Sequence, residues 1–440
     1  MRPIYFILRI SLPYIYSVFF RRRKVLNYQW KFYRQAIFVS NHPSAFLDPL
    51  LVANEQISVI HFMTRSDVFK AWLQPITWAA HMVPIYRTEQ DGSDSREKNK
   101  EVFRGVQKIL KKKRSLIMFG EGYTDDVFIR RLKPLKKGPA RIGFGTMDAS
   151  DWELNIKIIP VGVNYTNPGV FRSDVLTSYG KEIYLKDYKE LYSENPNKAV
   201  TQLIRDLDVA MKENLTHIED KSLADFLEHI LILNRKGMNW VNYEKNDSLE
   251  KRFRYTQNAA KNINENYNEE SSTWTELKDR LKDYVNRASS KGLEPVNIHR
   301  IKNGKSGISP LRYLFLLLGL PFAVVGAIHC FIPFFGVKKM VEKMFRRKVF
   351  WSGVKIILAA FFSALINLPV IWLFYEYVYE SYWLALLYYF VVPGLTFVIA
   401  YNWGKNVNKI LKWSKADKTL IKDLVEENKS LSKELNELGF

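Results

Sequence analysis

The sequence predicts an α/β domain, built on a central sheet flanked by helices, followed by a helical segment and C-terminal transmembrane helices. Short β-rich runs alternate with helical segments from residue 36 to about 190, the next part is polar, and three later blocks are strongly apolar. The expected parts are an N-terminal membrane-associated helix (1–28), the α/β domain (29–235), a polar helical segment (236–306), a membrane domain (307–403) and an amphipathic cytoplasmic tail (404–440).

The N-terminal run MRPIYFILRISLPYIYSVFF is apolar and precedes a basic cluster, Arg21 to Lys24. A secretion signal carries its basic residues first and a small-residue cleavage site afterwards, and this run has neither arrangement. Arg9 and Pro13 interrupt it. We therefore expect a helix in the membrane interface with its basic end at lipid headgroups, and a buried first helix is the alternative.

The α/β domain is expected to contain five strands and three main helices. The strand candidates are AIFVS (36–40), ISVIHFM (57–63), MVPIY (82–86), SLIMF (115–119) and IKIIPVGVNY (156–165). The helix candidates are residues 95–113, 139–147 and 198–215, the last with Val200, Leu203, Ile204, Leu207 and Met211 at helical spacing. Loops at the strand ends would carry the chemistry. The polar stretch from Lys236 to Ser306 reads as solvated helices forming a spacer.

Three apolar blocks, 311–336, 353–378 and 382–403, are each long enough to cross a bilayer. Basic segments at 338–348 and 404–415 flank the last two blocks, so the positive-inside rule places both flanks in the cytoplasm.

A full crossing by the first block would separate the basic segments between the two sides of the membrane. We therefore predict that Gly319 and Pro321 break this block into a re-entrant or interfacial hairpin, with a spanning helix as the alternative. In the tail, Leu424, Leu431 and Leu438 recur every seven residues, which predicts a short amphipathic or coiled-coil helix.

The net charge of +21 and the pI of about 9.6 require a partner that accepts cations, such as nucleic acid, an anionic membrane or an acidic substrate. The single cysteine, Cys330, excludes a disulfide framework and a thiolate metal cluster. The histidines outside the segment discussed next show no metal-ligand spacing, so no metal is expected.

The segment VSNHPSAFLDPLL (39–51) holds the candidate catalytic pair, His42 and Asp48. A strand leads into it, Pro43 keeps His42 out of the helix, and Ser44 is a suitable N-cap for a helix through AFLDPLL. The imidazole could then fold back onto Asp48, which is the geometry of a general base oriented by a carboxylate. The alternative is a helix start that carries both groups incidentally.

Two further strand ends carry polar groups. Gly120, Glu121 and Gly122 turn sharply after strand 115–119, and Arg87 follows strand 82–86 with a guanidinium suited to phosphate.

In order along the chain, the blocks at 41–48, 83–87, 119–124 and 159–161 resemble NHxxxxD, IPIxR, FPEGTRS and the VP strand of the phospholipid and glycerol acyltransferase family. The resemblance covers roughly residues 30–210. It implies a glycerol-phosphate-acyltransferase-like sheet and acyl transfer from acyl-CoA or an acyl-carrier-protein thioester to glycerol-3-phosphate or 1-acylglycerol-3-phosphate. The thioester is a co-substrate, and no cofactor is implied. The implied catalytic residues are His42 and Asp48, and the substrate-binding residues are Asn41, Arg87, Gly120, Glu121, Gly122, Arg130 and Lys133.

Two departures from the family pattern concern the acceptor. Five residues separate His42 from Asp48 where the commonest pattern has four, which is similar to a branch that includes fungal-type glycerol-3-phosphate and dihydroxyacetone-phosphate acyltransferases. Thr124 stands where an arginine would help to hold phosphate, and the charge could come from basic residues that follow closely: Arg130, Arg131, Lys133, Lys136 and Lys137.

The expected partners are membrane lipids, the acyl thioester and the acceptor, with acyl carrier protein as one donor carrier. The expected location is the cytoplasmic membrane, with the active site facing the cytoplasm. Three alternatives remain open: action on another lysolipid, an inactive lipid-binding membrane protein, and a nucleic-acid-binding membrane protein, for which we find no motif.

Overall fold

The computed structural model describes residues 2–28, 33–86, 94–241 and 246–440, and it divides into two compact units. Unit 1 comprises Met1–Ser17, Arg22–Pro168 and Val175–His217. Unit 2 comprises Val18–Arg21, Gly169–Asp174 and Ile218–Phe440. The main division therefore follows His217, whereas the sequence suggested 235, because the helix that begins at Ala224 packs against later helices.

Unit 1 is built on an eight-stranded sheet of order β1-β7-β6-β2-β5-β3-β4, with β8 paired to β6. The contacts of β2 with β5 and β6, and of β3 with β4 and β5, are parallel, whereas β7 and β8 run antiparallel to β6. The strands are β1 Arg22–Leu26, β2 Ala36–Ser40, β3 Ile60–Arg65, β4 Met82–Ile85, β5 Ser115–Phe119, β6 Lys157–Tyr165, β7 Asp174–Tyr179 and β8 Ile183–Tyr184. Every residue of β2 is buried, which explains the run of four apolar residues from Ala36 to Val39.

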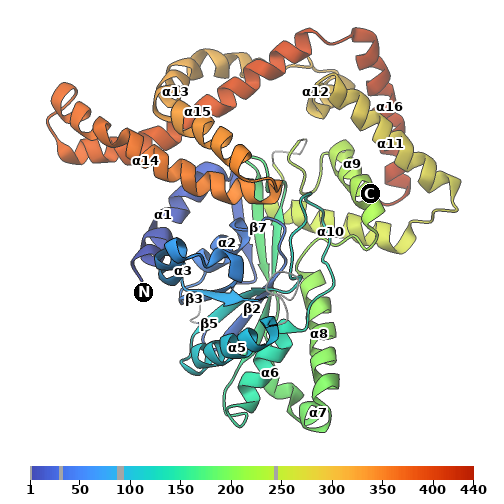
Figure 1. Ribbon diagram of the computed structural model, residues 1–440. Helices are drawn as coiled ribbons and strands as arrows, with labels where there is room; N and C mark the ends of the chain where they lie inside the picture. Colours follow the sequence, from blue (N-terminus) through green and yellow to red (C-terminus); the bar gives the residue numbers. More distant parts are fainter. Residues whose placement is uncertain (1, 29–32, 87–93, 242–245) are drawn as a thin grey trace. The chain divides into compact units, whose positions relative to one another are not determined.

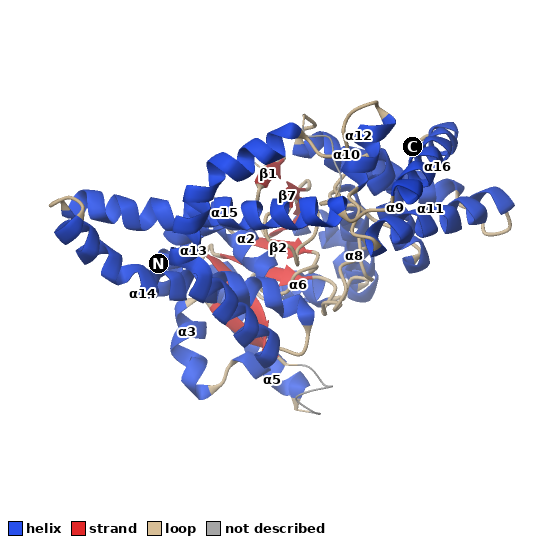
Figure 2. Ribbon diagram, turned by 90° about the horizontal axis from the view of Figure 1, so that it is seen from above, coloured by secondary structure: helices blue, strands red, loops and turns tan. Residues whose placement is uncertain are grey.

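Helices cover both faces of this sheet (Figures 1 and 2). On one face, Ile37 and Val39 of β2 share an apolar core with side chains of α5, α6 and α8. On the other face lie α1, α2 and α3 (Figure 1). The helices of this unit are α1 Pro3–Phe19, α2 Leu47–Glu55, α3 Gln74–Ala79, α5 Ser95–Lys111, α6 Gly138–Asp148, α7 Lys189–Glu194 and α8 Pro196–Glu213.

The five predicted strands and three predicted helices are confirmed, with ends shifted by at most three residues. The N-terminal segment differs from the expectation, because α1 ends at Phe19 and the basic cluster starts strand β1. Helix α1 is partly buried. It buries Tyr5 and Tyr16 in the unit, whereas Ile7 and Ile10 are 61% and 62% exposed.

Unit 2 is helical. Its elements are α9 Ala224–Asn234, α10 Leu249–Asn266, α11 Ser272–Ser290, α12 Pro295–Lys302, α13 Pro310–Met344, α14 Trp351–Tyr377, α15 Tyr382–Ser414 and α16 Lys418–Glu437. The polar segment is not a solvated spacer, because α10, α11 and α12 share an apolar core with α9 and α16. Phe253, Leu281 and Ile298 are fully buried there, as are Leu424 and Leu431 of the tail. The heptad leucines of the tail therefore pack within the chain.

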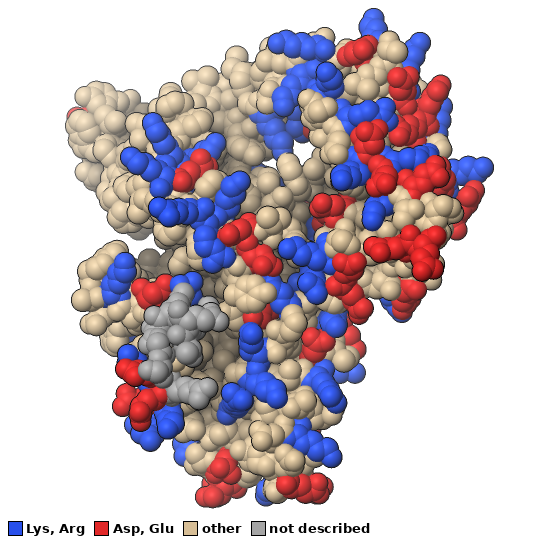
Figure 3. Space-filling model, turned by 45° about the vertical axis from the view of Figure 1, so that its right-hand side comes forward, with Lys and Arg blue, Asp and Glu red and all other residues tan. Residues whose placement is uncertain are grey.

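Helices α13, α14 and α15 are long and apolar enough to cross a membrane. In Figure 3 the upper-left lobe, where Figure 1 places the tip of the α14–α15 hairpin, is almost free of charged side chains. The break predicted in the first apolar block is wrong, since α13 continues through Gly319 and Pro321. A glycine there permits close packing instead: Gly319 lies against Trp403 of α15, whose indole donates to the Leu316 carbonyl at 2.8 Å. The start of α13 therefore lies beside the end of α15.

Candidate active site

The parallel pairing of β2 with β5 and β6 brings their carboxyl ends to one edge of the sheet. Ser40, the last residue of β2, is in register with Phe119 of β5 and with Val161 of β6. The loops that start at residues 41 and 120 therefore begin side by side, as expected for a site at the strand ends of an α/β sheet.

Asn41 holds the start of the first loop against β6. Its side-chain amide donates to the Val163 carbonyl at 3.0 Å and its carbonyl accepts from the Val163 N–H at 2.8 Å. The side chain thus makes the same pair of hydrogen bonds to β6 that the backbone of a further strand residue would make. Because this pairing occupies the amide of a buried residue, the structure favours a positioning role for Asn41 over the predicted substrate contact.

His42 and Asp48 form a hydrogen-bonded pair, with Nδ1 of His42 3.0 Å from Oδ2 of Asp48. The Asp48 side chain is fully buried, whereas that of His42 is 18% exposed. The imidazole also stacks on the Phe119 ring, with 3.8 Å between centroids and 18° between planes. In the described residues no hydrogen-bond partner is found for Nε2 of His42. This nitrogen is therefore free to take a proton from a bound group.

The extra residue between His42 and Asp48 is absorbed by a turn, not by a longer helix. Helix α2 begins at Leu47, so the prediction that Ser44 is its N-cap is wrong. The Ser44 N–H instead donates to Oδ2 of Asp48 at 2.8 Å, and Ala45 adopts a positive φ of 39°. This backbone conformation is uncommon for alanine. The turn brings the imidazole back onto a carboxylate six residues later.

Glu121 lies beneath this loop and is 2% exposed. Its carboxylate accepts a hydrogen bond from the His42 backbone N–H and lies 3.7 Å from Nζ of Lys133. Burial raises the pKa of Glu121 to about 7, because desolvation outweighs the attraction of Lys133. Lys133 also pairs with Asp125 at 3.1 Å and lies over the Tyr123 ring. Both predicted residues are therefore involved in holding the turn in place.

Gly120 and Gly122, in the loop that starts at residue 120, allow tight packing. A side chain on Gly120 would lie 2.8 Å from Leu135, and Gly122 has a φ of +77°. The side chain of Lys136 passes over Gly122, and its backbone N–H donates to the Gly120 carbonyl. Lys136 is exposed and no hydrogen-bond partner is found for its ammonium group among the described residues. It is therefore the basic side chain best placed to meet an anion at this loop.

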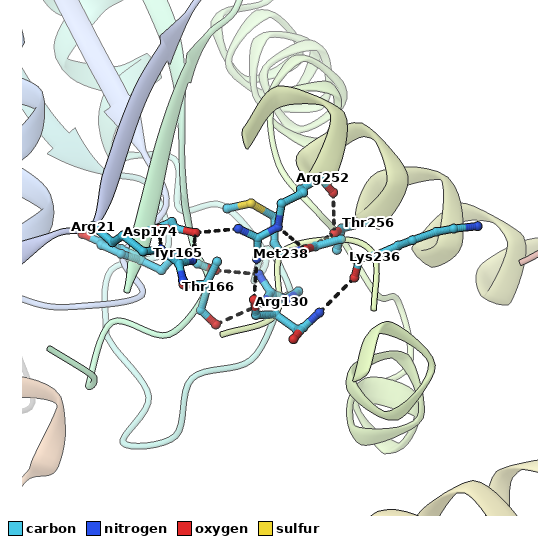
Figure 4. A network of polar contacts seen from close by, with 11 residues as sticks. Arg21, Arg130, Tyr165, Thr166, Asp174, Lys236, Met238, Arg252 and Thr256 are labelled. Carbon is cyan, nitrogen blue, oxygen red and sulfur yellow. Dashed lines mark hydrogen bonds and ion pairs between the residues drawn. The ribbon is translucent and has the colours of Figure 1, made fainter. Parts of the chain in front are cut away.

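Arg130 is buried, and its guanidinium donates to the carbonyls of Tyr165 at 2.7 Å and Thr166 at 3.3 Å (Figure 4). It therefore fastens the end of β6, which argues against the predicted contact with substrate. Arg87, the predicted phosphate ligand after β4, lies outside the described residues.

The sequence analysis missed Tyr165, which completes the hydrogen bonding of Asp48. Its hydroxyl donates to Oδ1 of Asp48 at 2.8 Å, and the residue is fully buried at the end of β6. Burial and the neighbouring carboxylate raise the pKa of Tyr165 well above its ordinary value, so it remains a donor. Its place on the strand that carries the fourth block, four residues after Val161, was the available signal, but no residue pattern linked it to Asp48.

In the described residues, no group of three or more His, Cys, Asp or Glu side chains could hold a metal ion. The arrangement at the sheet edge is instead suited to proton abstraction. A partly exposed imidazole is oriented by a fully buried carboxylate.

Comparisons with known proteins give a consistent picture. Residues 22–164 match the model of the family described as Acyltransferase. Over 80 residues, 18% of this chain and 10% of the relative, the sequence is 38% identical to glycerol-3-phosphate O-acyltransferase 1 of Saccharomyces cerevisiae. The chain thus corresponds to a small part of that relative.

A solved structure, that of the 1-acyl-sn-glycerophosphate (LPA) acyltransferase PlsC from Thermotoga maritima, aligns with 47% of this chain and 83% of its own, at 16% identity and a TM-score of 0.32. The family model spans β1 to β6 and includes the His42–Asp48 pair and the Glu121 loop. Residues 22–164 of this chain are therefore similar to the acyltransferase family.

Proposed function

We propose that this protein is a membrane-bound O-acyltransferase of glycerophospholipid synthesis. It would transfer a fatty acyl group from an acyl-CoA or acyl-carrier-protein thioester to a hydroxyl of glycerol-3-phosphate or 1-acylglycerol-3-phosphate. The observation that carries the proposal is the 3.0 Å contact between His42 and a fully buried Asp48 at the strand ends of a domain that matches the acyltransferase family.

In the proposed reaction Nε2 of His42 removes the proton of the acceptor hydroxyl as its oxygen attacks the thioester carbonyl. Asp48 holds the imidazole in the tautomer with the proton on Nδ1 and stabilises the imidazolium that forms. The carbonyl–sulfur bond then breaks, and the thiolate takes the proton back from His42. The ester and the free thiol are the products, and no other reactant is needed.

The acceptor phosphate would be held by Lys136, and Arg87, which lies outside the described residues, keeps its predicted role as a second phosphate ligand. This replaces the predicted roles of Arg130 and Lys133, whose cationic groups are already engaged with carbonyls and carboxylates. Fixing the phosphate fixes the hydroxyl near the base, which lowers the entropic part of the barrier.

Unit 1 has a surface suited to the membrane interface, where the acyl substrates lie. Ile7 and Ile10 of α1 are exposed, and so is Trp78 of α3, at 58%. The guanidinium of Arg2 lies 4.2 Å from the Trp78 ring, which joins the start of α1 to α3. Exposed tryptophan and aliphatic side chains beside a cation are typical of interfacial binding.

The test supplies membranes that contain the protein with acyl-CoA or acyl-carrier-protein thioester and one acceptor at a time, and identifies the products by mass spectrometry. We expect His42→Ala and Asp48→Asn to lower turnover by about 10²- to 10⁴-fold. Asp208→Asn, which alters an exposed ion pair with Lys212 on α8, is the control and should retain full activity. Wild-type turnover by His42→Ala would refute the assigned base.

A further inference from the structure

Unit 2 contains a cavity of about 820 Å³ at the start of α13 and the end of α15. Helix α12 and the segment around Phe171 complete its wall. Its volume lies within the range of sites that bind small molecules and lipid headgroups. None of its lining residues belongs to the unit that holds His42.

The lining is strongly cationic. Eight of its side chains are basic and one is acidic: Arg21, Arg172, Arg235, Arg300, Lys305, Arg312, Lys405 and Lys409 against Glu294. Glu294 is shared by two of these cations, Arg312 at 2.9 Å and Lys409. In the described residues no carboxylate pairs with Arg300, Lys305 or Lys405. Such a concentration of like charge destabilises the fold unless an anion enters.

One donor of this wall is buried without a protein acceptor. Nη1 of Arg312 is inaccessible to solvent and has no hydrogen-bond partner among the described residues, while Nη2 of the same guanidinium is held by Glu294. A buried donor without an acceptor is unfavourable, so a ligand oxygen here would be stabilising. Phosphate oxygens suit this guanidinium particularly well.

The polar wall is rigidly supported. Asp174 accepts from Arg21 at 2.9 Å and from the fully buried Arg252 at 2.5 Å (Figure 4). Arg172 of the same segment donates to the Phe20 carbonyl at 2.9 Å. Two of the cations that line the cavity, Arg21 and Arg172, are therefore held by contacts behind them.

The remaining wall is apolar and leads along the membrane helices. Leu311 and Phe315 lie one turn apart on α13, and Ile399 lies on α15. Leu311 is 73% exposed, and the exposed apolar surface of α13 continues with Leu314 and Leu318. A ligand with an anionic head and a hydrocarbon chain matches both parts, whereas a water-soluble phosphate matches only the first.

We propose that this cavity binds the phosphate headgroup of an anionic glycerolipid whose acyl chain lies along the apolar faces of α13 and α15. The proposal concerns a second site in the membrane-helix unit and does not depend on acyl transfer at His42.

The test uses the purified full chain in a neutral detergent. Binding of short-chain phosphatidate is measured by native mass spectrometry and by thermal shift, with phosphatidylcholine, phosphatidylglycerol, coenzyme A and inorganic phosphate as separate arms. We expect phosphatidate and phosphatidylglycerol, which are both anionic, to bind, whereas binding of zwitterionic phosphatidylcholine with equal strength would overturn the proposal. The double variant Arg300→Gln/Lys405→Gln should weaken it at least tenfold. The control Lys338→Gln/Lys343→Gln removes the same charge from exposed positions at the other end of α13 and should bind normally.

Each arm decides the proposal. Equal binding of phosphatidate by the two double variants would overturn the assigned site. Equal competition by inorganic phosphate or coenzyme A would show a phosphate site without lipid specificity and would also overturn it. His42→Ala should bind phosphatidate normally, so failure of the proposed reaction and failure of this lipid site are distinguishable.

Discussion

Tyr165→Phe should impair the proposed reaction without altering either substrate's binding. The substitution removes only the hydroxyl that donates to Oδ1 of Asp48 at 2.8 Å, while the contacts of Oδ2 with His42 and the Ser44 N–H remain. A hydrogen bond to a charged group contributes about 1.5–3 kcal/mol. Because a factor of ten in rate corresponds to about 1.4 kcal/mol, the largest effect on kcat is roughly 10- to 100-fold. We expect the lower end, since Asp48 keeps two donors.

The chain offers a matched control in Tyr179→Phe. Tyr179 is also fully buried, lies on the neighbouring strand β7, and donates to Glu55 of α2 at 2.8 Å. Both variants should lower the melting temperature, because each removes a donor from a buried carboxyl group. Only Tyr165→Phe should lower kcat.

The assay measures initial rates over a range of donor and acceptor concentrations, together with the melting temperature of each variant. KM should stay unchanged in Tyr165→Phe, since a fully buried residue cannot touch the substrates. If both variants lose the same activity, or if Tyr165→Phe keeps the wild-type kcat, the hydroxyl does not act through Asp48 and the reasoning fails.

Three further predictions concern single contacts. Lys136→Ala should raise KM for a phosphate-bearing acceptor about tenfold at unchanged kcat. Lys137→Ala is the control and should leave KM unchanged, because the Lys137 ammonium group donates to a hydroxyl on α8. Equal KM values for the two variants would exclude this phosphate contact. The pKa of Glu121 is about 7 in the folded state, above the ordinary value of 4.5, so the folded state holds this proton more tightly than the unfolded state. The resulting stabilisation is present below pH 4.5 and is lost as pH rises to about 7. The free energy of unfolding should fall by about 3 kcal/mol over this range. Thermal unfolding across this range should show the wild type losing stability relative to Glu121→Gln, and parallel profiles would contradict the shift. Gly326→Ala should lower the melting temperature, since a side chain on Gly326 would lie 2.2 Å from a backbone oxygen of α15. Gly336→Ala should not lower it, because the space around Gly336 is open. Equal melting temperatures of the two variants would argue against the close contact of α13 with α15.

The sequence predicted those residues of the candidate site that lie directly after a strand. The apolar runs at 36–40 and 115–119 are buried strands, so their periodicity and length located His42 and Glu121 at loop starts. Proximity in the sequence named Lys136 among five basic candidates for the phosphate, but it could not separate them. Arg130 and Lys133 lie close to the loop in sequence, but their side chains turn inward to carbonyls and carboxylates. Lys136 instead remains exposed over the Gly122 turn.

In unit 2, too, local sequence predicted the elements but not their contacts. The apolar blocks predicted membrane helices because length and hydropathy are local properties. Local sequence also marked Gly319 as a helix breaker, but its actual partner is Trp403, far along the chain.

The sequence by itself predicted five strands and three main helices of unit 1, the apolar helices α13 to α15 and the candidate His42–Asp48 pair, because these depend on periodicity and on motif spacing. Only the tertiary structure decided that Tyr165 supports Asp48, that Ala45 makes the turn that accommodates the extra residue, and that eight basic side chains meet around one cavity. Each of these depends on side chains that are distant in the sequence or on a single backbone angle. Neither leaves a repeating pattern in the residues, so packing alone reveals them.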